Sequence, residues 1–203
     1  LTLAPKAILD GIALTNLRTA AVSILALRSL AVPSSAEMIV FGAGPQARSH
    51  ARAVAAEWPL RRIRVASRTR ETAQQCVDDL ARGVPGIDIV PLAPEDVEGA
   101  VPLADIIVCA TTAETPVFDS LPRDGAAIVA VGSHSPRQRE LPGPLMKRAY
   151  VVVEDRETAL REAGDIVLAI DDGLLTREDI DADLGELVRG ARVDVAGPRV
   201  FKS

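Results

Sequence analysis

The sequence predicts an α/β fold, a doubly wound parallel sheet with helices on both faces. Short apolar runs recur along the chain and are separated by segments with helical spacing of apolar residues. Most of these runs are continuously apolar rather than alternating, which is typical of strands buried on both faces. Strands that alternate with helices in this way form βαβ units.

The elements follow in order along the chain. The first is a helix over residues 14–31, with Thr15 as its N-cap, and Pro33 ends it. The expected strands are residues 38–41, 63–66, 87–90, 106–110, 127–131 and 150–153. The expected helices among them are residues 46–57, 71–82, 94–100 and 157–162. Later come a turn at 171–173, helical turns at 176–179 and 184–189, and a return strand within 193–201.

Composition bounds the function. The 203 residues are 48% hydrophobic and 25% charged, so the chain can bury a core and is not disordered. A net charge of −5 and 2% aromatic residues argue against a nucleic-acid partner. The longest apolar stretch, residues 19–32, is interrupted by Arg28 and is too short to span a bilayer, so no membrane association is expected.

The cysteines and acidic clusters predict no metal site. Cys76 and Cys109 lack the spacing of a zinc site or a disulfide framework, and they fit a reducing cytoplasm. The acidic residues at 171–172 and 179–183 lack the glycine and terminal glutamate of a calcium loop, so solvated turns are expected there. We therefore expect a cytoplasmic protein without a metal.

A glycine-rich loop is the sharpest chemical signal. The pattern G-x-G-x-x-A directly follows an apolar strand and precedes a helix; its residues are Gly42, Ala43, Gly44, Pro45, Gln46 and Ala47. The first glycine permits the turn, the second leaves room for a pyrophosphate, and the alanine keeps the helix close to the sheet. This context predicts a Rossmann-type dinucleotide-binding fold. The alternative is a tight strand-to-helix turn that binds no nucleotide.

The end of the second predicted strand indicates which dinucleotide binds. An NAD-binding protein usually carries Asp or Glu at this position, on the ribose hydroxyls. Here the strand is followed by Ser67, Arg68, Thr69 and Arg70. Guanidinium groups suit a 2′-phosphate, so we expect NADP(H) to be preferred, with NAD(H) possible. The alternative is that both arginines are solvated residues at a helix start.

Several motifs together resemble the ornithine cyclodeaminase/μ-crystallin family. They are LTNLRTAA at 14–21, GAGPQA at 42–47, ATT at 110–112 with Pro116, VGS to REL across 131–141, EAGD at 162–165, LGELV at 184–188 with Gly190, and VFKS at 200–203. They occur in the family's order over nearly the whole chain, and they look most like the ketimine or pyrroline-2-carboxylate reductase branch.

The resemblance implies a homodimer whose subunit has two domains. Residues 35–170 would be the dinucleotide-binding domain. Residues 1–34 would be a remnant of a substrate and dimerisation domain, and residues 171–203 would return to it. The N-terminal part and C-terminal tail of the family are expected to lie outside this sequence.

The resemblance also implies roles for single residues. Arg18 would pair with the substrate carboxylate, which suits a forked guanidinium; otherwise it is a structurally paired arginine. Thr19, Gln46 and Ser203 would touch the cofactor. The residues that follow two later strands would line the cofactor path, since ligands bind at the carboxyl ends of strands; they are Ala110, Thr111, Thr112, Val131, Gly132 and Ser133. Otherwise both segments are ordinary loops.

His134 stands where the cyclodeaminase branch of the family carries an Asp that acts as acid and base. This departure favours imine reduction over cyclisation. His134 is a candidate catalytic proton carrier or, alternatively, a loop histidine with no chemical role. The other histidine, His50, is expected to face solvent or pack locally.

These expectations define one main hypothesis and three alternatives. The main hypothesis is a nicotinamide-dependent oxidoreductase that reduces the C=N bond of a small amino-acid-derived substrate, a cyclic or open ketimine carboxylate. Reduction of Δ1-pyrroline-2-carboxylate to proline is an example. The alternatives are an ornithine cyclodeaminase-type lyase, an amino-acid dehydrogenase and a non-catalytic NADPH-binding protein.

Overall fold

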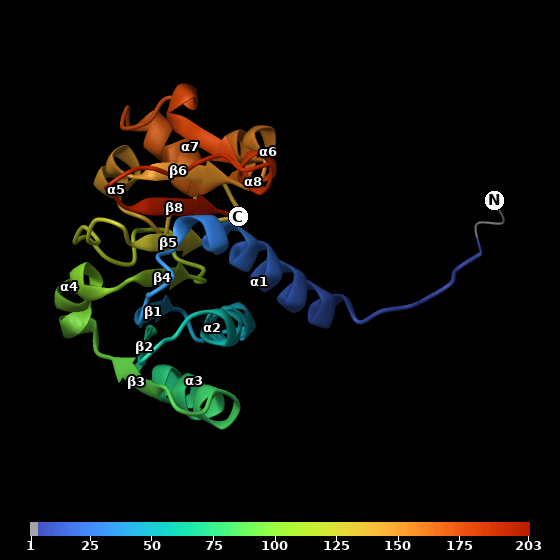
Figure 1. Ribbon diagram of the computed structural model, residues 1–203, viewed down its shortest axis with the longest axis vertical. Helices are drawn as coiled ribbons and strands as arrows, with labels where there is room; N and C mark the ends of the chain where they lie inside the picture. Colours follow the sequence, from blue (N-terminus) through green and yellow to red (C-terminus); the bar gives the residue numbers. More distant parts are fainter. Residues whose placement is uncertain (1–3) are drawn as a thin grey trace.

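Eight strands form a single parallel sheet in the computed structural model, which describes residues 4–203 (Figure 1). The strands are β1 (Glu37–Phe41), β2 (Arg62–Ala66), β3 (Asp88–Leu92), β4 (Ile106–Cys109), β5 (Ala127–Ala130), β6 (Tyr150–Val153), β7 (Ile180–Asp183) and β8 (Arg199–Lys202). Their order is β3-β2-β1-β4-β5-β8-β6-β7, and every neighbouring pair is parallel. The predicted doubly wound parallel sheet is confirmed.

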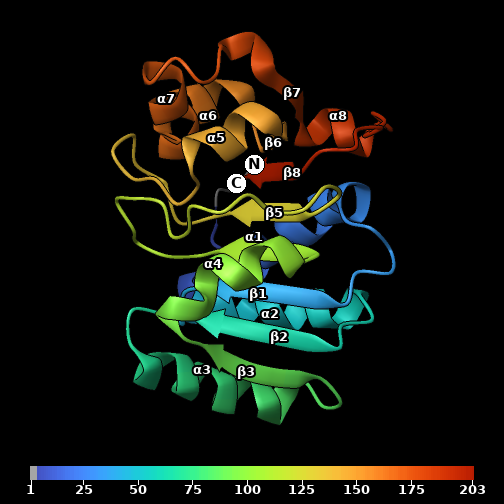
Figure 2. The same cartoon turned by 90° about the vertical axis from the view of Figure 1, so that its left-hand side faces the viewer.

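Helices cover both faces of this sheet. They are α1 (Gly11–Leu30), α2 (Pro45–Glu57), α3 (Arg70–Gly83), α4 (Val97–Ala100), α5 (Gly143–Arg148), α6 (Arg156–Glu162), α7 (Gly164–Asp171) and α8 (Leu184–Val188), with short 3-10 turns η1 (Pro94–Asp96), η2 (Val101–Leu103) and η3 (Arg177–Asp179). Buried residues of α1, α2, α3 and α8 belong to one core cluster, and those of α4 to α7 belong to the other. Figure 2 shows α4 in front of β1 and α2 behind it.

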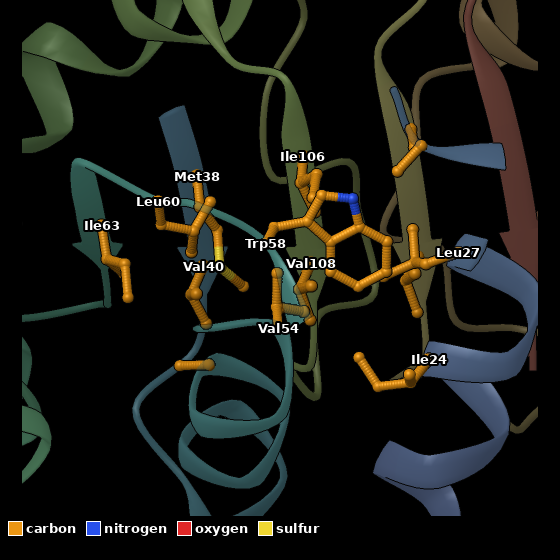
Figure 3. Close-up of a cluster of buried hydrophobic side chains, with 14 of the residues drawn as sticks. Ile24, Leu27, Met38, Val40, Val54, Trp58, Leu60, Ile63, Ile106 and Val108 are labelled. Carbon is orange, nitrogen blue, oxygen red and sulfur yellow. The ribbon is translucent and has the colours of Figure 1, made fainter. Parts of the chain in front are cut away.

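The core between α1, α2 and the sheet fixes the position of α1. Ile24 and Leu27 of α1 lie beside Trp58 and the apolar side chains of β1 and β4 (Figure 3). A fully buried side chain of this size contributes about 1.5–3 kcal/mol. The N-terminal half of α1 extends away from this core and exposes Ile12, Leu14 and Leu17 (Figure 1). Apolar packing therefore anchors the second half of the helix, whereas the first half is tied to the rest of the described structure by polar contacts of Asn16 and Arg18.

The start of α1 differs from the prediction. The helix begins at Gly11, and the Asp10 carboxylate accepts hydrogen bonds from the amides of Ile12 at 2.8 Å and Ala13 at 3.2 Å. Thr15, the predicted N-cap, instead donates its hydroxyl to the Gly11 carbonyl inside the helix. An ionised carboxylate at the first turn satisfies two free amides and complements the helix dipole, which a hydroxyl four residues later cannot do.

The last thirty residues continue the sheet. The acidic segment that was expected to be a solvated turn forms the edge strand β7, with Ile180 and Ala182 buried and Asp181 exposed. Asp181 accepts a hydrogen bond from the amide of Val151 on β6 at 2.7 Å. The return strand is shorter than expected, and it lies between β5 and β6 as β8. The sheet therefore runs past the predicted domain boundary at residue 170.

Two helices were not predicted. α5 begins with Gly143 and Pro144, which disfavour a helix, and α7 is an apolar run that could have been a strand by length alone.

Within residues 4–203, no helix is long and apolar enough to cross a bilayer. No three His, Cys, Asp or Glu side chains in that range are placed to hold a metal ion. Cys76 and Cys109 are buried free thiols.

Candidate functional site

The carboxyl ends of the strands share one edge of the sheet, and the predicted site residues gather there. Since all strands are parallel, the loops after β1, β2, β4 and β5 leave from this edge. The strand order reverses between β1 and β4, and open α/β sheets bind ligands at such a point. The edge between β1 and β4 is therefore the candidate binding crevice.

The glycine loop has the geometry of a phosphate-binding turn. Gly42 has φ +109°, and a Cβ there would lie closer than 3.0 Å to the Ala110 carbonyl oxygen, so the turn requires glycine. Gly44 is the N-cap of α2 and offers no side-chain cap, and a Cβ added to it would meet nothing within 4 Å. Pro45 is the first residue of α2, and Ala47 is fully buried against the sheet. The positive end of α2 is thus open to an anion.

Gln46 is a second feature of the loop that suits a bound ligand. Its Nε2 donates to Oδ1 of Asn16 at 3.1 Å, whereas its Oε1 is buried and has no partner among the described residues. A buried acceptor without a partner costs about 1–3 kcal/mol. A bound molecule with an N–H or O–H group would satisfy it, so the loop fits a dinucleotide. Ala43 lies half-buried beside it.

The segment after β2 is exposed and carries free positive charge. Thr69 is the N-cap of α3 and accepts the Thr72 amide, and Ser67 Oγ lies 2.8 Å from Thr72 Oγ1. The two hydroxyls predicted to bind cofactor are therefore also used locally. Arg68 and Arg70 are exposed, and within the described part of the chain neither forms an ion pair. Both guanidiniums are available to an anionic ligand.

The loops after β4 and β5 are joined by Glu140, whose role the sequence did not reveal. Its Oε1 accepts the Thr111 amide at 2.6 Å and the Thr111 hydroxyl at 2.7 Å, and its Oε2 accepts the Gly132 amide at 2.6 Å. A Cβ on Gly132 would lie closer than 3.0 Å to the Thr111 carbonyl oxygen and to Glu140, so Gly132 permits this close approach. The amides of Thr111 and Gly132 and the Thr111 hydroxyl, which were expected to face the cofactor, are thus bonded to a buried carboxylate.

Ser133 also lies inside the molecule, where the prediction placed it on the cofactor path. It is fully buried, and its hydroxyl donates to the Asp165 carboxylate. Asp165 also accepts the amides of Glu140 at 2.8 Å and Leu141 at 2.9 Å. The other predicted loop residues remain accessible: Thr112 is exposed, and Ala110, Thr111, Val131 and Gly132 are half-buried.

Lys202 is the third buried charge near this edge. It is 1% exposed, and its Nζ donates to the carbonyl of Ala130 at 3.1 Å and to that of Ser203. Burial lowers the pKa of the Lys202 ammonium and raises the pKa of the Glu140 carboxyl, since both charged forms lose water. The sequence signal is a lysine that directly follows the apolar residues Val200 and Phe201 at a strand end.

Arg18 reaches the same edge from α1. Its Nη2 lies 2.7 Å from Oε1 of Glu154, which directly follows β6. The Ser203 hydroxyl donates to Oε2 of the same carboxylate at 2.9 Å. The structure therefore brings together the two residues expected to contact substrate and cofactor, and it adds Glu154, which the sequence did not indicate.

The two histidines occupy different environments. His50 is fully buried and packs locally, which is the second of the two expected arrangements: Nε2 lies 2.9 Å from Ser23 Oγ and Nδ1 lies 2.8 Å from the Gln46 carbonyl oxygen. It thus joins α1, beside the buried Thr19, to the first turn of α2. His134 is exposed, and its Nδ1 lies 2.8 Å from the Gly132 carbonyl. A carbonyl only accepts, so Nδ1 is the donor in this contact and Nε2 points elsewhere.

Known proteins resemble this chain along nearly all its length. The sequence model of the ornithine cyclodeaminase/mu-crystallin family matches residues 2–201. Ketimine reductase mu-crystallin of Rattus norvegicus is 40% identical over 187 residues, which are 92% of this chain and 55% of the relative. Delta(1)-pyrroline-2-carboxylate reductase of Bacillus cereus is 36% identical over 191 residues, 93% of this chain and 57% of the relative.

A solved structure supports the same relationship. Thermococcus litoralis Delta(1)-pyrroline-2-carboxylate reductase, in complex with NADH and L-proline, has a TM-score of 0.90 and 31% sequence identity. It is matched over 100% of this chain and 63% of its own. The chain therefore spans only a little over half the length of these relatives. On the motifs, the fold and these matches, the chain belongs to the ornithine cyclodeaminase/mu-crystallin family.

Proposed function

We propose that the full protein is an oxidoreductase that reduces the C=N bond of a ketimine carboxylate such as Δ1-pyrroline-2-carboxylate, giving an α-amino acid. The observation that carries this proposal is one shared edge of the sheet. The open N-terminus of α2 lies on it beside β4, and Arg18 reaches it from α1. A dinucleotide and a carboxylate can thus be held by the same edge, and the relatives named above act on such molecules.

The cofactor would lie across the crevice between β1 and β4. The amides of Gln46 and Ala47 in the first turn of α2 would hold its phosphates, and Gln46 Oε1 would gain a donor. The accessible residues Ala110, Thr112 and Val131 would line the path towards its reactive end. A bound reduced nicotinamide supplies a hydride to the imine carbon.

Cofactor choice would depend on the exposed segment after β2. Arg68 and Arg70 are free to hold a 2′-phosphate, and no carboxylate stands there to accept ribose hydroxyls. We therefore infer a preference for NADPH over NADH. The Thermococcus litoralis structure contains NADH, and the ratio of NADPH to NADH affinity distinguishes the two cofactors for this protein.

The substrate carboxylate would replace Glu154 on Arg18. The Arg18–Glu154 pair is partly exposed, with 60% and 30% of the side chains accessible, and such pairs contribute only about 0.2–1 kcal/mol. A substrate carboxylate can therefore exchange for the Glu154 carboxylate at little cost. Arg18 then orients the imine carbon, and the released Glu154 keeps its hydrogen bond from Ser203.

Proton balance requires one proton for the nitrogen of the reduced imine. His134 is exposed at the same edge, and its Nε2 can take up a proton from solvent and pass it to the imine nitrogen, so His134 is the candidate carrier of that proton. An imine that arrives already protonated would not need it. We also infer a homodimer, supported by the exposed apolar residues of the first half of α1. A cytoplasmic location is supported by the two free cysteines, Cys76 and Cys109.

The test measures loss of nicotinamide absorbance by the full-length protein with Δ1-pyrroline-2-carboxylate and either NADPH or NADH. The proposal expects NADPH to be consumed faster. Ammonia released from ornithine with no net change in NAD would instead establish the lyase. Consumption of NADPH only with a 2-oxo acid and ammonia would establish an amino-acid dehydrogenase. NADPH binding with no turnover on any of these would establish the binding protein.

A further inference from the structure

Three charged side chains are buried together beneath the carboxyl ends of β4, β5 and β8. Glu140 and Asp165 are fully buried and Lys202 is 1% exposed. Burying a charge is costly unless it is paired and hydrogen-bonded, and well-packed apolar residues are often as stable or more stable at such places. A cluster of this kind next to the candidate crevice therefore calls for a role beyond packing.

The Glu140 carboxylate joins the chains that leave β4 and β5, just beyond the last hydrogen bond between these two strands. The ladder between β4 and β5 extends to the bond from the Val131 amide to the Cys109 carbonyl, at 2.8 Å. One residue further on, both strands have diverged into loops. There Glu140 holds the amides of Thr111 and Gly132, each at 2.6 Å. One carboxylate thus sets the spacing of the two loops.

The Asp165 carboxylate in turn fixes the backbone of Glu140. Its Oδ1 accepts the Glu140 and Leu141 amides, and its Oδ2 accepts the Ser133 hydroxyl. The preceding residue, Gly164, lets α7 approach closely, since a Cβ there would lie within 3.0 Å of the Gln138 carbonyl oxygen. Both ends of the segment between Gly132 and Leu141 are therefore tied to one residue of α7.

We propose that Glu140, held by Asp165, is a positioning residue that fixes the loops after β4 and β5 in the arrangement in which the nicotinamide ring meets the imine. The inference rests on the proposed function, since those loops line the path to the reactive end of the cofactor. Glu140 itself faces the interior and touches neither ligand. Its effect is exerted through the backbones of Thr111 and Gly132. A displacement of about 1 Å at a reacting centre can lower a rate about 100-fold.

The experiment uses the full-length protein with Glu140→Gln. An amide has one acceptor oxygen and one NH₂ group, so one of the two loops would face a donor instead of an acceptor. The matched control is Glu98→Gln. Glu98 also accepts two backbone amides in a loop, those of Asp119 at 3.0 Å and Ser120 at 2.6 Å, and it lies on α4 among exposed residues.

Three readouts separate positioning from folding. The first is the dissociation constant of NADPH, expected within about 3-fold of wild type in both variants, because the phosphate loop is intact. The second is kcat with its primary isotope effect from 4-deuterated NADPH. Glu140→Gln is expected to lower kcat about 100-fold and to change the isotope effect. A loss of folded protein would lower the rate without changing the isotope effect. The third is the nicotinamide fluorescence of bound NADPH at saturation, expected to change only in Glu140→Gln.

The outcomes distinguish this inference from the proposed function. A wild-type protein that binds NADPH but reduces no imine overturns the function, while altered fluorescence in Glu140→Gln alone still supports positioning. A rate, isotope effect and fluorescence equal to those of Glu98→Gln overturn the inference. If Glu140→Gln does not fold, Thr111→Val removes the hydroxyl bond to Glu140, together with the bond that this hydroxyl accepts from the Ala113 amide at 3.1 Å, and keeps the bond from the Thr111 amide to Glu140. It is expected to change the same readouts in the same direction by a smaller factor, and wild-type values in it contradict the proposal.

Discussion

The loops after β4 and β5 and the segment after β2 lie on the same edge of the sheet but are built in opposite ways. The first pair is held from inside by Glu140 and Asp165, both fully buried. The second exposes Arg68 and Arg70, which pair with no carboxylate in residues 4–203. Buried hydrogen bonds fix backbone positions, whereas exposed free charge selects among ligands. We infer that the first region determines how a bound cofactor is held and the second determines which cofactor binds.

The largest expected effect comes from Gly132→Ala. The new Cβ would lie closer than 3.0 Å to the Thr111 carbonyl and to Glu140, which cannot retreat because its carboxylate is bonded on both oxygens. We expect a loss of about 3 kcal/mol in the free energy of unfolding, measured by urea denaturation. An unchanged urea midpoint would show that the two loops are not tightly joined.

Gly44→Ala is the matched control for that substitution. A Cβ at Gly44 would meet nothing within 4 Å and its φ of −83° suits alanine, so the urea midpoint should not change. The methyl group would instead occupy the space left for the phosphates. We expect at least about a 10-fold weaker binding of NADPH by titration, which corresponds to about 1.4 kcal/mol.

Arg18 and Glu154 should respond with opposite signs. Arg18→Met removes a charged hydrogen bond of about 1.5–3 kcal/mol, so kcat/KM for the imine should fall about 10- to 100-fold, with the NADPH dissociation constant unchanged. Glu154→Gln removes the competing carboxylate, so KM should fall a few-fold. Steady-state kinetics measure both, and a rise of KM in Glu154→Gln would contradict the exchange.

Substitutions in the segment after β2 should alter the choice between NADPH and NADH and leave the free energy of unfolding unchanged. Replacing Arg68 and Arg70 together with alanine should lower the ratio of NADPH to NADH affinity about 10-fold or more. Exposed substitutions of this kind usually change the free energy of unfolding by less than about 0.5 kcal/mol. Titration of both cofactors into both proteins measures the ratio, and an unchanged ratio would show that the arginines are only solvated residues.

These two regions also show how far the sequence could be interpreted. The parallel sheet, the glycine loop and the exposed arginines were predictable, because continuous apolar runs and short local motifs carry that information. The Glu140 bonds were not, because they join residues 29 and 8 positions apart through a fold that has no local signature. The same limit applies to Glu154 on Arg18, which is 136 positions away. β7 was missed because alternating aspartates at a sheet edge look like a turn.

The smallest effect is expected at the joint between α1 and α2. Burial lowers the pKa of His50 below its ordinary value of 6.5, so the folded protein resists protonation of the imidazole. The unfolded chain takes up that proton as the pH falls below 6.5, and stability should fall with it until the folded-state pKa is reached. Between pH 7.5 and 5.5, wild type should lose more free energy of unfolding than His50→Gln. Parallel urea titrations would contradict this if both proteins lost the same amount.

The most direct measurement follows the hydrogen itself. The full-length protein is mixed with 4,4-dideuterated NADPH, which carries deuterium on both faces, and Δ1-pyrroline-2-carboxylate, and the product is examined by mass spectrometry. Transfer to the imine predicts proline with one deuterium at the α-carbon, in proportion to the NADPH consumed. Unlabelled proline, or proline formed only from ornithine with the deuterium left on the cofactor, would contradict the proposed function.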